Sequence, residues 1–157
     1  MNKQKIGILN PGNMGIAVAA SIQNTGHTVY WVSENRGPNT HKRAEEFGLQ
    51  DAKNLKKLCE TCSAIVSVCP PHAAEAVANQ VSALGFGGLY IDVNALSPDR
   101  TKQIAQVIQK TGGTFVDGGI IGSPPKEREK TWLYLSGSKA KSGQRLFSAV
   151  ILITSLG

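Results

Sequence analysis

The sequence contains no apolar run long enough to cross a membrane. Its longest apolar run, residues 149–153, is far shorter than the ~20 residues that a membrane-spanning helix needs. Residues 2–5 are polar or charged and lead directly into a strand-like segment, so the apolar core of a secretory signal is missing. These absences indicate a cytoplasmic protein without a membrane partner.

Cysteine is scarce, with three residues in the chain. Cys59 and Cys62 form a C-x-x-C pair, but a zinc ribbon needs a second pair, which three cysteines cannot supply. A thioredoxin-like pair opens a helix, whose N-terminus lowers the thiol pKa, whereas this pair closes the helix-like segment 51–60. We therefore expect buried structural thiols and no metal site.

Acidic and aromatic side chains are also few. Eleven Asp and Glu stand against 17 Lys and Arg, which gives a net charge of +6, and aromatic residues make up 6% of the chain. The basic residues are scattered, and no aromatic residues interleave with them as they do in nucleic-acid-binding surfaces. The charge therefore favours an anionic small molecule over a nucleic acid as the partner.

What the chain does contain is an alternation of short apolar segments and amphipathic ones. Its 157 residues suffice for about one domain, and 41% hydrophobic residues are too many for a disordered chain. Helices are predicted between most of the strands, the first capped by Asn13 and the last covering residues 140–147. The predicted strands cover residues 5–10, 28–32, 64–69, 89–93, 114–117 and 132–135.

This order predicts an α/β fold of the Rossmann type: a doubly wound, mostly parallel sheet with helices on both faces. We expect a single dinucleotide-binding domain across residues 1–157, with residues 146–157 as an apolar tail. The tail is predicted to form an edge strand or an exposed patch, through which the chain would form a homodimer or aggregate. Ligands of such sheets lie at the carboxyl ends of the strands.

The turn after the first predicted strand carries the strongest motif. A dinucleotide fingerprint reads G-x-G-x-x-G, and here Asn10 stands in the place of the first glycine. The second glycine lets the backbone approach a pyrophosphate, and the third lets the helix pack closely on the strand. Backbone N–H groups at the helix start supply the anion site. The predicted cofactor-binding residues of this turn are Asn10, Pro11, Gly12, Asn13, Met14 and Gly15.

The end of the second predicted strand bears on the choice between NADP and NAD. If the strand ends at Ser33, its hydroxyl and Arg36 suit a 2′-phosphate, and Glu34 turns outward. If it ends at Glu34, that carboxylate would hold the ribose diol and repel a phosphate, because a shift of one residue reverses the side chain. We favour NADP as the cofactor, with NAD as the alternative.

Four segments together resemble a known family, the β-hydroxyacid dehydrogenases, which include hydroxyisobutyrate dehydrogenase and the NADP-binding domain of phosphogluconate dehydrogenase. The Gly-Asn-Met-Gly turn at residues 12–15 is the first of them. The likeness continues in the same order over nearly the whole chain, through residues 67–71, 90–98 and 115–125. The 33–36 and 122–125 loops look closest to a less characterised branch of oxidoreductases.

The resemblance implies further cofactor contacts. Cys69, Pro70 and Pro71 would line the path of the adenosine and the nicotinamide ribose, and Asn94 would face the nicotinamide carboxamide. It also implies hydride transfer to or from a small hydroxyacid or ketoacid substrate. Ile121, Gly122 and Ser123 occupy the substrate-carboxylate loop, where Ile121 replaces the serine usual in the family and Ser123 is the candidate for a displaced hydroxyl.

Members of this family continue into a helical second domain that supplies the catalytic lysine. This sequence stops at Gly157, about where that domain would begin, and we expect both to be absent from it. The main hypothesis is therefore the nucleotide-binding part of an oxidoreductase that needs the helical domain for turnover. The alternative is a non-catalytic nucleotide-binding module or a truncated remnant without turnover.

Overall fold

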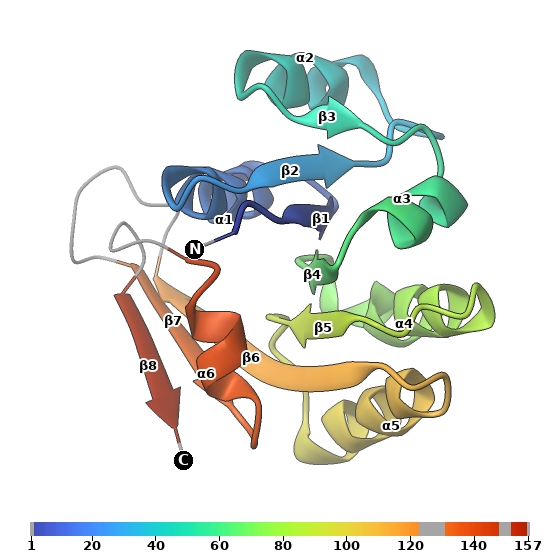
Figure 1. Cartoon of the computed structure of the whole chain (residues 1–157), viewed down its shortest axis with the longest axis vertical. Coiled ribbons are helices and arrows are strands. Elements are labelled where there is room, and N and C mark those ends of the chain that lie inside the picture. The colour runs from blue at the N-terminus through green and yellow to red at the C-terminus, as the bar shows by residue number, and fades with distance from the viewer. Residues whose placement is uncertain (1, 123–130, 148–151, 157) are drawn as a thin grey trace.

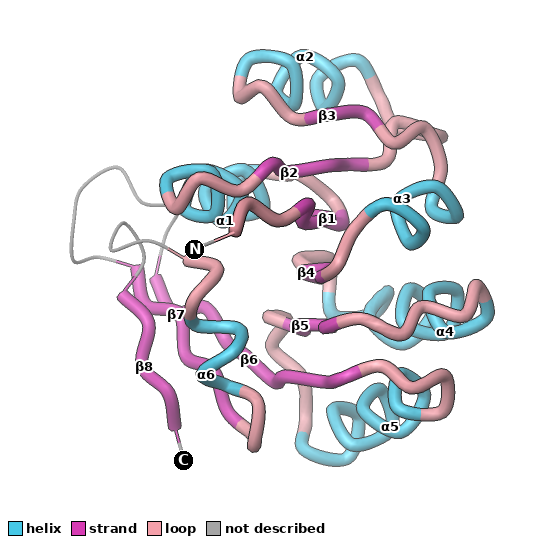
Figure 2. Tube along the Cα trace, viewed as in Figure 1, coloured by secondary structure: helices cyan, strands magenta, loops and turns pink. Residues whose placement is uncertain are grey.

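A computed structural model of the chain describes residues 2–122, 131–147 and 152–156. Strands and helices alternate along the chain (Figure 2), and the strands form one sheet of eight in the order β3-β2-β1-β4-β5-β6-β7-β8, which can be followed in Figure 1 from β3 to β8. The pairs are parallel except for β6 with β7. The predicted mostly parallel Rossmann-type sheet is thus confirmed.

The strands are β1 (Lys5–Leu9), β2 (Thr28–Trp31), β3 (Gln50–Asp51), β4 (Ala64–Ser67), β5 (Leu89–Asp92), β6 (Thr114–Gly122), β7 (Thr131–Ser136) and β8 (Leu152–Leu156). The α-helices are α1 (Asn13–Asn24), α2 (Pro38–Glu46), α3 (Leu55–Thr61), α4 (Ala74–Ala83), α5 (Pro98–Gln109) and α6 (Ala140–Gln144). A 3-10 turn, η1 (Pro71–Ala73), precedes α4.

Helices cover both faces of the sheet, and each face has its own core. Successive residues of a strand point to opposite faces, so Ile65 belongs to one core while its neighbours Ala64 and Val66 belong to the other. One core joins the sheet to α1, α2 and α6 through Val18, Ala44 and Ala140. The other joins it to α3, α4 and α5 through Leu58, Val81 and Ile108.

Three local predictions need correction. Asn13 does not cap α1: Gly12 occupies the cap position, and Asn13 is the first helical residue. The segment predicted as a helix over residues 51–60 begins as the end of β3, and α3 starts only after Asn54, whose side chain accepts a 2.9 Å hydrogen bond from the Lys57 amide. The last helix ends at Gln144, after which Leu146 and Phe147 turn into the core.

The C-terminal half of the sheet differs most from expectation. β6 extends beyond the predicted residue 117 to Gly122, because residues 117–122 pair antiparallel with β7. Residues 152–156 of the tail form β8, which pairs with β7 at the end of the sheet order, so the predicted edge strand is present. In the described part of the chain no helix is long and apolar enough to cross a membrane.

Candidate functional site

The turn between β1 and α1 keeps the geometry of a dinucleotide turn although its first glycine is missing. Asn10 has a φ of 64°, the left-handed conformation that glycine adopts freely and that asparagine tolerates better than most residues. Its carbonyl oxygen accepts a 2.8 Å hydrogen bond from the amide of Gly12. Asn10 therefore takes the conformational role of the absent glycine.

The two glycines of this turn have different surroundings. A methyl group at Gly15 would lie 2.4 Å from the carbonyl oxygen of Asn10, so only glycine fits there. A methyl group at Gly12 would meet no atom within 4 Å. The turn is thus tight on its inner side and open at Gly12, as the approach of a pyrophosphate to the start of α1 requires.

A cavity of about 290 Å³ lies beside this turn, between the ends of β1, β2 and β4. Five of its ten lining residues are apolar, and the other five are polar or charged. Its lining residues are Leu9, Asn10, Val32, Glu34, Asn35, Arg36, Leu55, Cys69, Val77 and Gln80. The cavity therefore brings together predicted cofactor residues from three separate segments of the chain.

The other predicted residues of the β1–α1 turn and of the segment after β4 are absent from this lining. Pro11 is buried, Met14 is half-buried, and Asn13 faces a second cavity between α1 and α2. Pro70 and Pro71 are exposed just beyond β4.

The loop after β2 corresponds to neither register considered from the sequence. β2 already ends at Trp31, and residues 33–36 form a turn closed by a 3.1 Å hydrogen bond from the Arg36 amide to the Ser33 carbonyl. Asn35 has a φ of 59° within it. Because of this turn, the candidate diol ligand Glu34 and the candidate phosphate ligand Arg36 both line the cavity.

Asn94 joins the ends of β4 and β5. Its Oδ1 accepts a 2.8 Å hydrogen bond from the Cys69 amide, and its Nδ2 donates to Ser67 Oγ at 3.2 Å. Asn94 is itself only 6% exposed. Its amide thus holds Cys69 at the wall of the cavity, in addition to the nicotinamide contact that the resemblance implies.

A salt bridge restrains the segment that follows β4. Arg100 of α5 pairs with Glu75 of α4 and also donates to the carbonyl of Pro71. The hydrogen bond from Arg100 lowers the pKa of Glu75 to about 2. This contact joins the segment after β4 to the start of α5, so it restrains the segment that carries Pro70 and Pro71.

Two carboxylates lie side by side on β5 and β6: Asp92, the last residue of β5, is the register partner of Asp117 within β6. Burial raises the pKa of Asp92 to about 6, against the opposing effect of the Asn94 amide, which donates to Asp92 Oδ1 at 2.8 Å. The charge of Asp117 raises it further. Burial also raises the pKa of Asp117. Asp92 Oδ2 is buried and has no hydrogen-bond partner among the described residues.

Of the three cysteines, Cys62 is buried as expected, whereas Cys59 and Cys69 are half-buried. All three are free thiols. Burial raises the pKa of Cys59 to about 11 and that of Cys62 to about 12, so both are protonated at neutral pH and poor nucleophiles. Among the described residues, no group of three or more His, Cys, Asp or Glu side chains could hold a metal ion.

Only part of the predicted substrate loop is described. Ile121 lies near the end of β6 and is 60% exposed, and Gly122 is the last residue of that strand. Ser123 lies outside the described residues.

Comparison with known proteins agrees with this geometry. The sequence profile described as the NAD binding domain of 6-phosphogluconate dehydrogenase matches residues 5–150. The chain belongs to this family. The resemblance to the hydroxyacid dehydrogenases that the motifs indicated is thereby confirmed.

The relatives of this NAD-binding domain are longer proteins. The chain is 25% identical over 142 residues to mouse mitochondrial 3-hydroxyisobutyrate dehydrogenase, covering 87% of this chain and 42% of that protein. It is 26% identical over 126 residues to the mouse cytokine-like nuclear factor N-PAC, covering 76% and 21%. The chain thus spans less than half the length of the curated relatives it matches.

Among solved structures, the fold is similar to that of a conserved protein of unknown function with structural similarity to 3-hydroxyacid dehydrogenases. The TM-score is 0.85 at 25% identity, and the match covers 98% of this chain and 57% of that chain.

Proposed function

We propose that this NAD-binding domain binds NADP(H) in the cavity at the ends of β1, β2 and β4. It would form the nucleotide-binding part of an oxidoreductase that acts on a small hydroxyacid or ketoacid. One observation carries the proposal: the same cavity is lined by Asn10 of the β1–α1 turn and by the exposed Arg36. The β1–α1 turn is also open at Gly12. The anion site at the start of α1 would then face the pyrophosphate, and Arg36 would face the 2′-phosphate of the adenosine ribose.

Each group of residues has a distinct part in this binding. The backbone N–H groups at the start of α1 would receive the pyrophosphate, and Arg36 would pair with the 2′-phosphate. Asn94 holds Cys69 in the cavity wall. The Arg100–Glu75 pair restrains the segment after β4, beside which the nicotinamide ribose would lie. The bound cofactor supplies the hydride chemistry. The proton donor for the substrate oxygen would come from a helical domain that completes the site.

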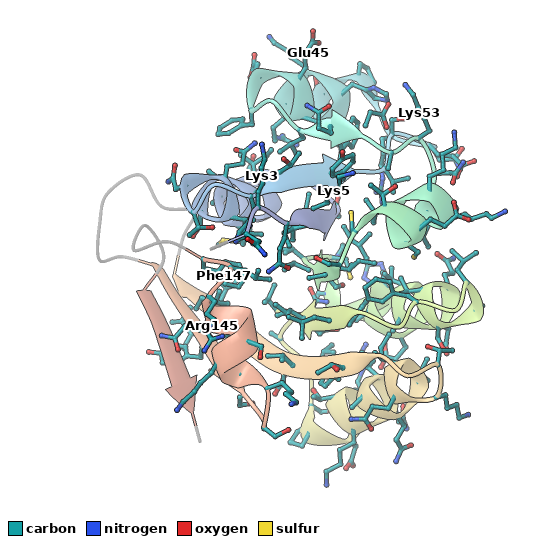
Figure 3. The ribbon with its side chains drawn as sticks, in the orientation of Figure 1. Lys3, Lys5, Glu45, Lys53, Arg145 and Phe147 are labelled. Carbon is teal, nitrogen blue, oxygen red and sulfur yellow. The ribbon has the colours of Figure 1, made fainter. Side chains whose placement is uncertain are left out.

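We expect Arg36→Ala to weaken NADPH binding about ten- to hundredfold, because a charge-assisted contact with phosphate is lost. NADH, which lacks the 2′-phosphate, should keep its affinity within about threefold. Calorimetric titration of both nucleotides measures this. Arg145→Ala is the matched control, because it removes the same charge from an exposed position beside α6 (Figure 3), and both affinities should then stay unchanged.

Two other outcomes would contradict the proposal in different ways. If NADH binds as tightly as NADPH and Glu34→Gln weakens it, the ribose contact belongs to Glu34 and the cofactor is NAD. If neither nucleotide binds, the domain is a folded remnant without cofactor.

The second candidate is a non-catalytic nucleotide-binding module. The similarity to N-PAC, which is named a nuclear factor and not a dehydrogenase, is the observation that favours it. Addition of a helical domain from a hydroxyacid dehydrogenase in trans distinguishes the two functions. Turnover of a hydroxyacid with NADP supports the oxidoreductase, and nucleotide binding without turnover supports the module.

A homodimer through the tail is a further part of the proposal. β8 ends the sheet, and an edge strand offers unpaired backbone groups to a second copy. We expect the 157-residue chain to sediment as a dimer or larger species at high concentration, and a clean monomer would contradict this.

A further inference from the structure

The segment that follows β4 is joined to the segment that follows β5 by the side chain of Asn94. β4 and β5 are parallel neighbours, so their carboxyl ends lie side by side (Figure 1). Asn94 Oδ1 accepts a 2.8 Å hydrogen bond from the Cys69 amide, two residues beyond the end of β4. Asn94 Nδ2 donates to Ser67 Oγ at 3.2 Å and lies 3.5 Å from Cys69 Sγ. One side chain thus bridges the ends of two strands.

The direction of this side chain leaves little of it for a ligand. Both polar atoms of the Asn94 amide are engaged with Ser67 and Cys69, and the residue is buried. Its backbone is fixed as well, because the Asn94 N–H donates to Asp92 Oδ1 at 2.8 Å. Asp92 and Ser67 are register partners and are themselves buried. To turn toward the nicotinamide, Asn94 would therefore have to break its hydrogen bonds to Ser67 and Cys69.

The residue that Asn94 holds belongs to the cavity wall. Cys69 lines the cavity together with Glu34 and Arg36, whereas Asn94 is absent from that lining. Glu34 and Arg36 are the candidate ligands of the adenosine ribose, so the cavity corresponds to the adenosine half of the cofactor. The position of Cys69 therefore affects the surroundings of the adenosine.

We propose that Asn94 is a positioning residue for the adenosine half of the cofactor, which holds Cys69 in the cavity wall and makes no direct contact with the nicotinamide. Ser67 supports it from β4, because the Ser67 hydroxyl accepts from the Asn94 amide. The inference rests on the proposed binding of NADP(H). In this role Asn94 does not make the nicotinamide contact that the resemblance implies.

Two ligands that differ only in the nicotinamide test this assignment: NADPH, and 2′-phospho-ADP-ribose, which lacks it. Asn94→Ala should weaken both about tenfold, because Cys69 loses its hydrogen bond and leaves the wall that both ligands contact. The ratio of the two affinities should stay within about twofold. Calorimetric titration of both ligands measures this. NADH and ADP-ribose form the equivalent pair if the chain prefers NAD.

Ser67→Ala is the milder variant, because it leaves Asn94 and its hydrogen bond to the Cys69 amide in place. We expect it to weaken both ligands about threefold. Combined with Asn94→Ala, it should weaken them no further than Asn94→Ala alone, since Ser67 acts through Asn94. Ser82→Ala is the matched control. Its hydroxyl also joins two elements, α4 and α5, through a 2.9 Å hydrogen bond to the Val107 carbonyl, and neither affinity should change.

Three results would overturn the inference. If Asn94→Ala weakens NADPH but not 2′-phospho-ADP-ribose, Asn94 binds the nicotinamide directly. If it weakens neither ligand, the position of Cys69 has no part in binding. If Ser67→Ala changes neither affinity while Asn94→Ala lowers both, Asn94 acts on the nucleotide without its link to β4.

Amide hydrogen exchange without nucleotide separates this inference from the proposed function. In the Asn94→Ala chain the Cys69 amide should exchange at least about tenfold faster relative to the Ile65 amide within β4, whose rate records any change in global stability. Equal acceleration of the two amides would show that Asn94 has only a general structural role. An unmodified chain that binds neither nucleotide would refute the proposed function, and the exchange rates would still decide whether Asn94 holds Cys69.

Discussion

Gly15→Ala is expected to destabilise the domain by about 3 kcal/mol or more and to abolish nucleotide binding. The added methyl group would lie 2.4 Å from the carbonyl oxygen of Asn10. A clash with backbone cannot be relieved by a rotamer change, so the start of α1 must move away from β1, and overpacking of this kind typically costs about 1–3 kcal/mol or more. Urea unfolding of the variant, followed by NADPH titration, measures both effects.

Gly12→Ala is the matched control, because it adds the same methyl group to the same turn. Nothing lies within 4 Å of that position, and the φ of −71° suits alanine, so stability should change by about 0.5 kcal/mol or less. NADPH binding should still fall at least about tenfold, since the methyl group covers the surface that the pyrophosphate would approach. Gly15→Ala with unchanged stability would contradict the tight-turn argument.

The order of strands and helices could be predicted because it depends on local periodicity. Val66 and its neighbours form a continuous apolar run buried on both faces, and such runs mark parallel strands in any α/β chain. β3 could not be predicted in the same way. It has two residues, too few to show a period, and exists because Tyr30 and Trp31 of β2 pair with it. The antiparallel extension of β6 likewise depends on a long-range partner.

The candidate site was predictable where one segment supplies the whole feature. The β1–α1 turn is such a case, because Asn10 adopts the left-handed conformation in place of the missing first glycine. The 33–36 turn was not predictable, since its Glu34 amide is held by the Lys53 carbonyl, which the pairing of β2 with β3 brings beside it. The Asp51-x-Lys53 spacing does indicate a turn after β3, because an aspartate side chain often accepts a hydrogen bond from the backbone amide two residues further on.

Asp92 gives the second large prediction, a stability that falls as the pH rises. Its pKa of about 6 in the folded chain lies above the ordinary 3.8 of the unfolded chain, chiefly because it is buried. The folded state therefore holds the proton more tightly, and the domain loses stability from about pH 4 upward until Asp92 is fully ionised above pH 6. The full cost is about 3 kcal/mol, and about 2 kcal/mol of it should appear between pH 4 and pH 7.

Asp92→Asn isolates this effect, because the amide keeps an oxygen for the Asn94 N–H and has no charge to lose. The difference in unfolding free energy between the variant and the unmodified chain should shift by about 2 kcal/mol in favour of the variant from pH 4 to pH 7. Carboxylates whose charge does not act on Asp92, such as Asp51 with its lowered pKa, contribute equally to both proteins and cancel in that difference. Asp117→Asn should narrow the pH range over which stability falls, since the Asp117 charge raises the pKa of Asp92. Parallel stability curves for Asp92→Asn and the unmodified chain would mean that Asp92 is ionised in the fold at no cost, and that water reaches it between β5 and β6.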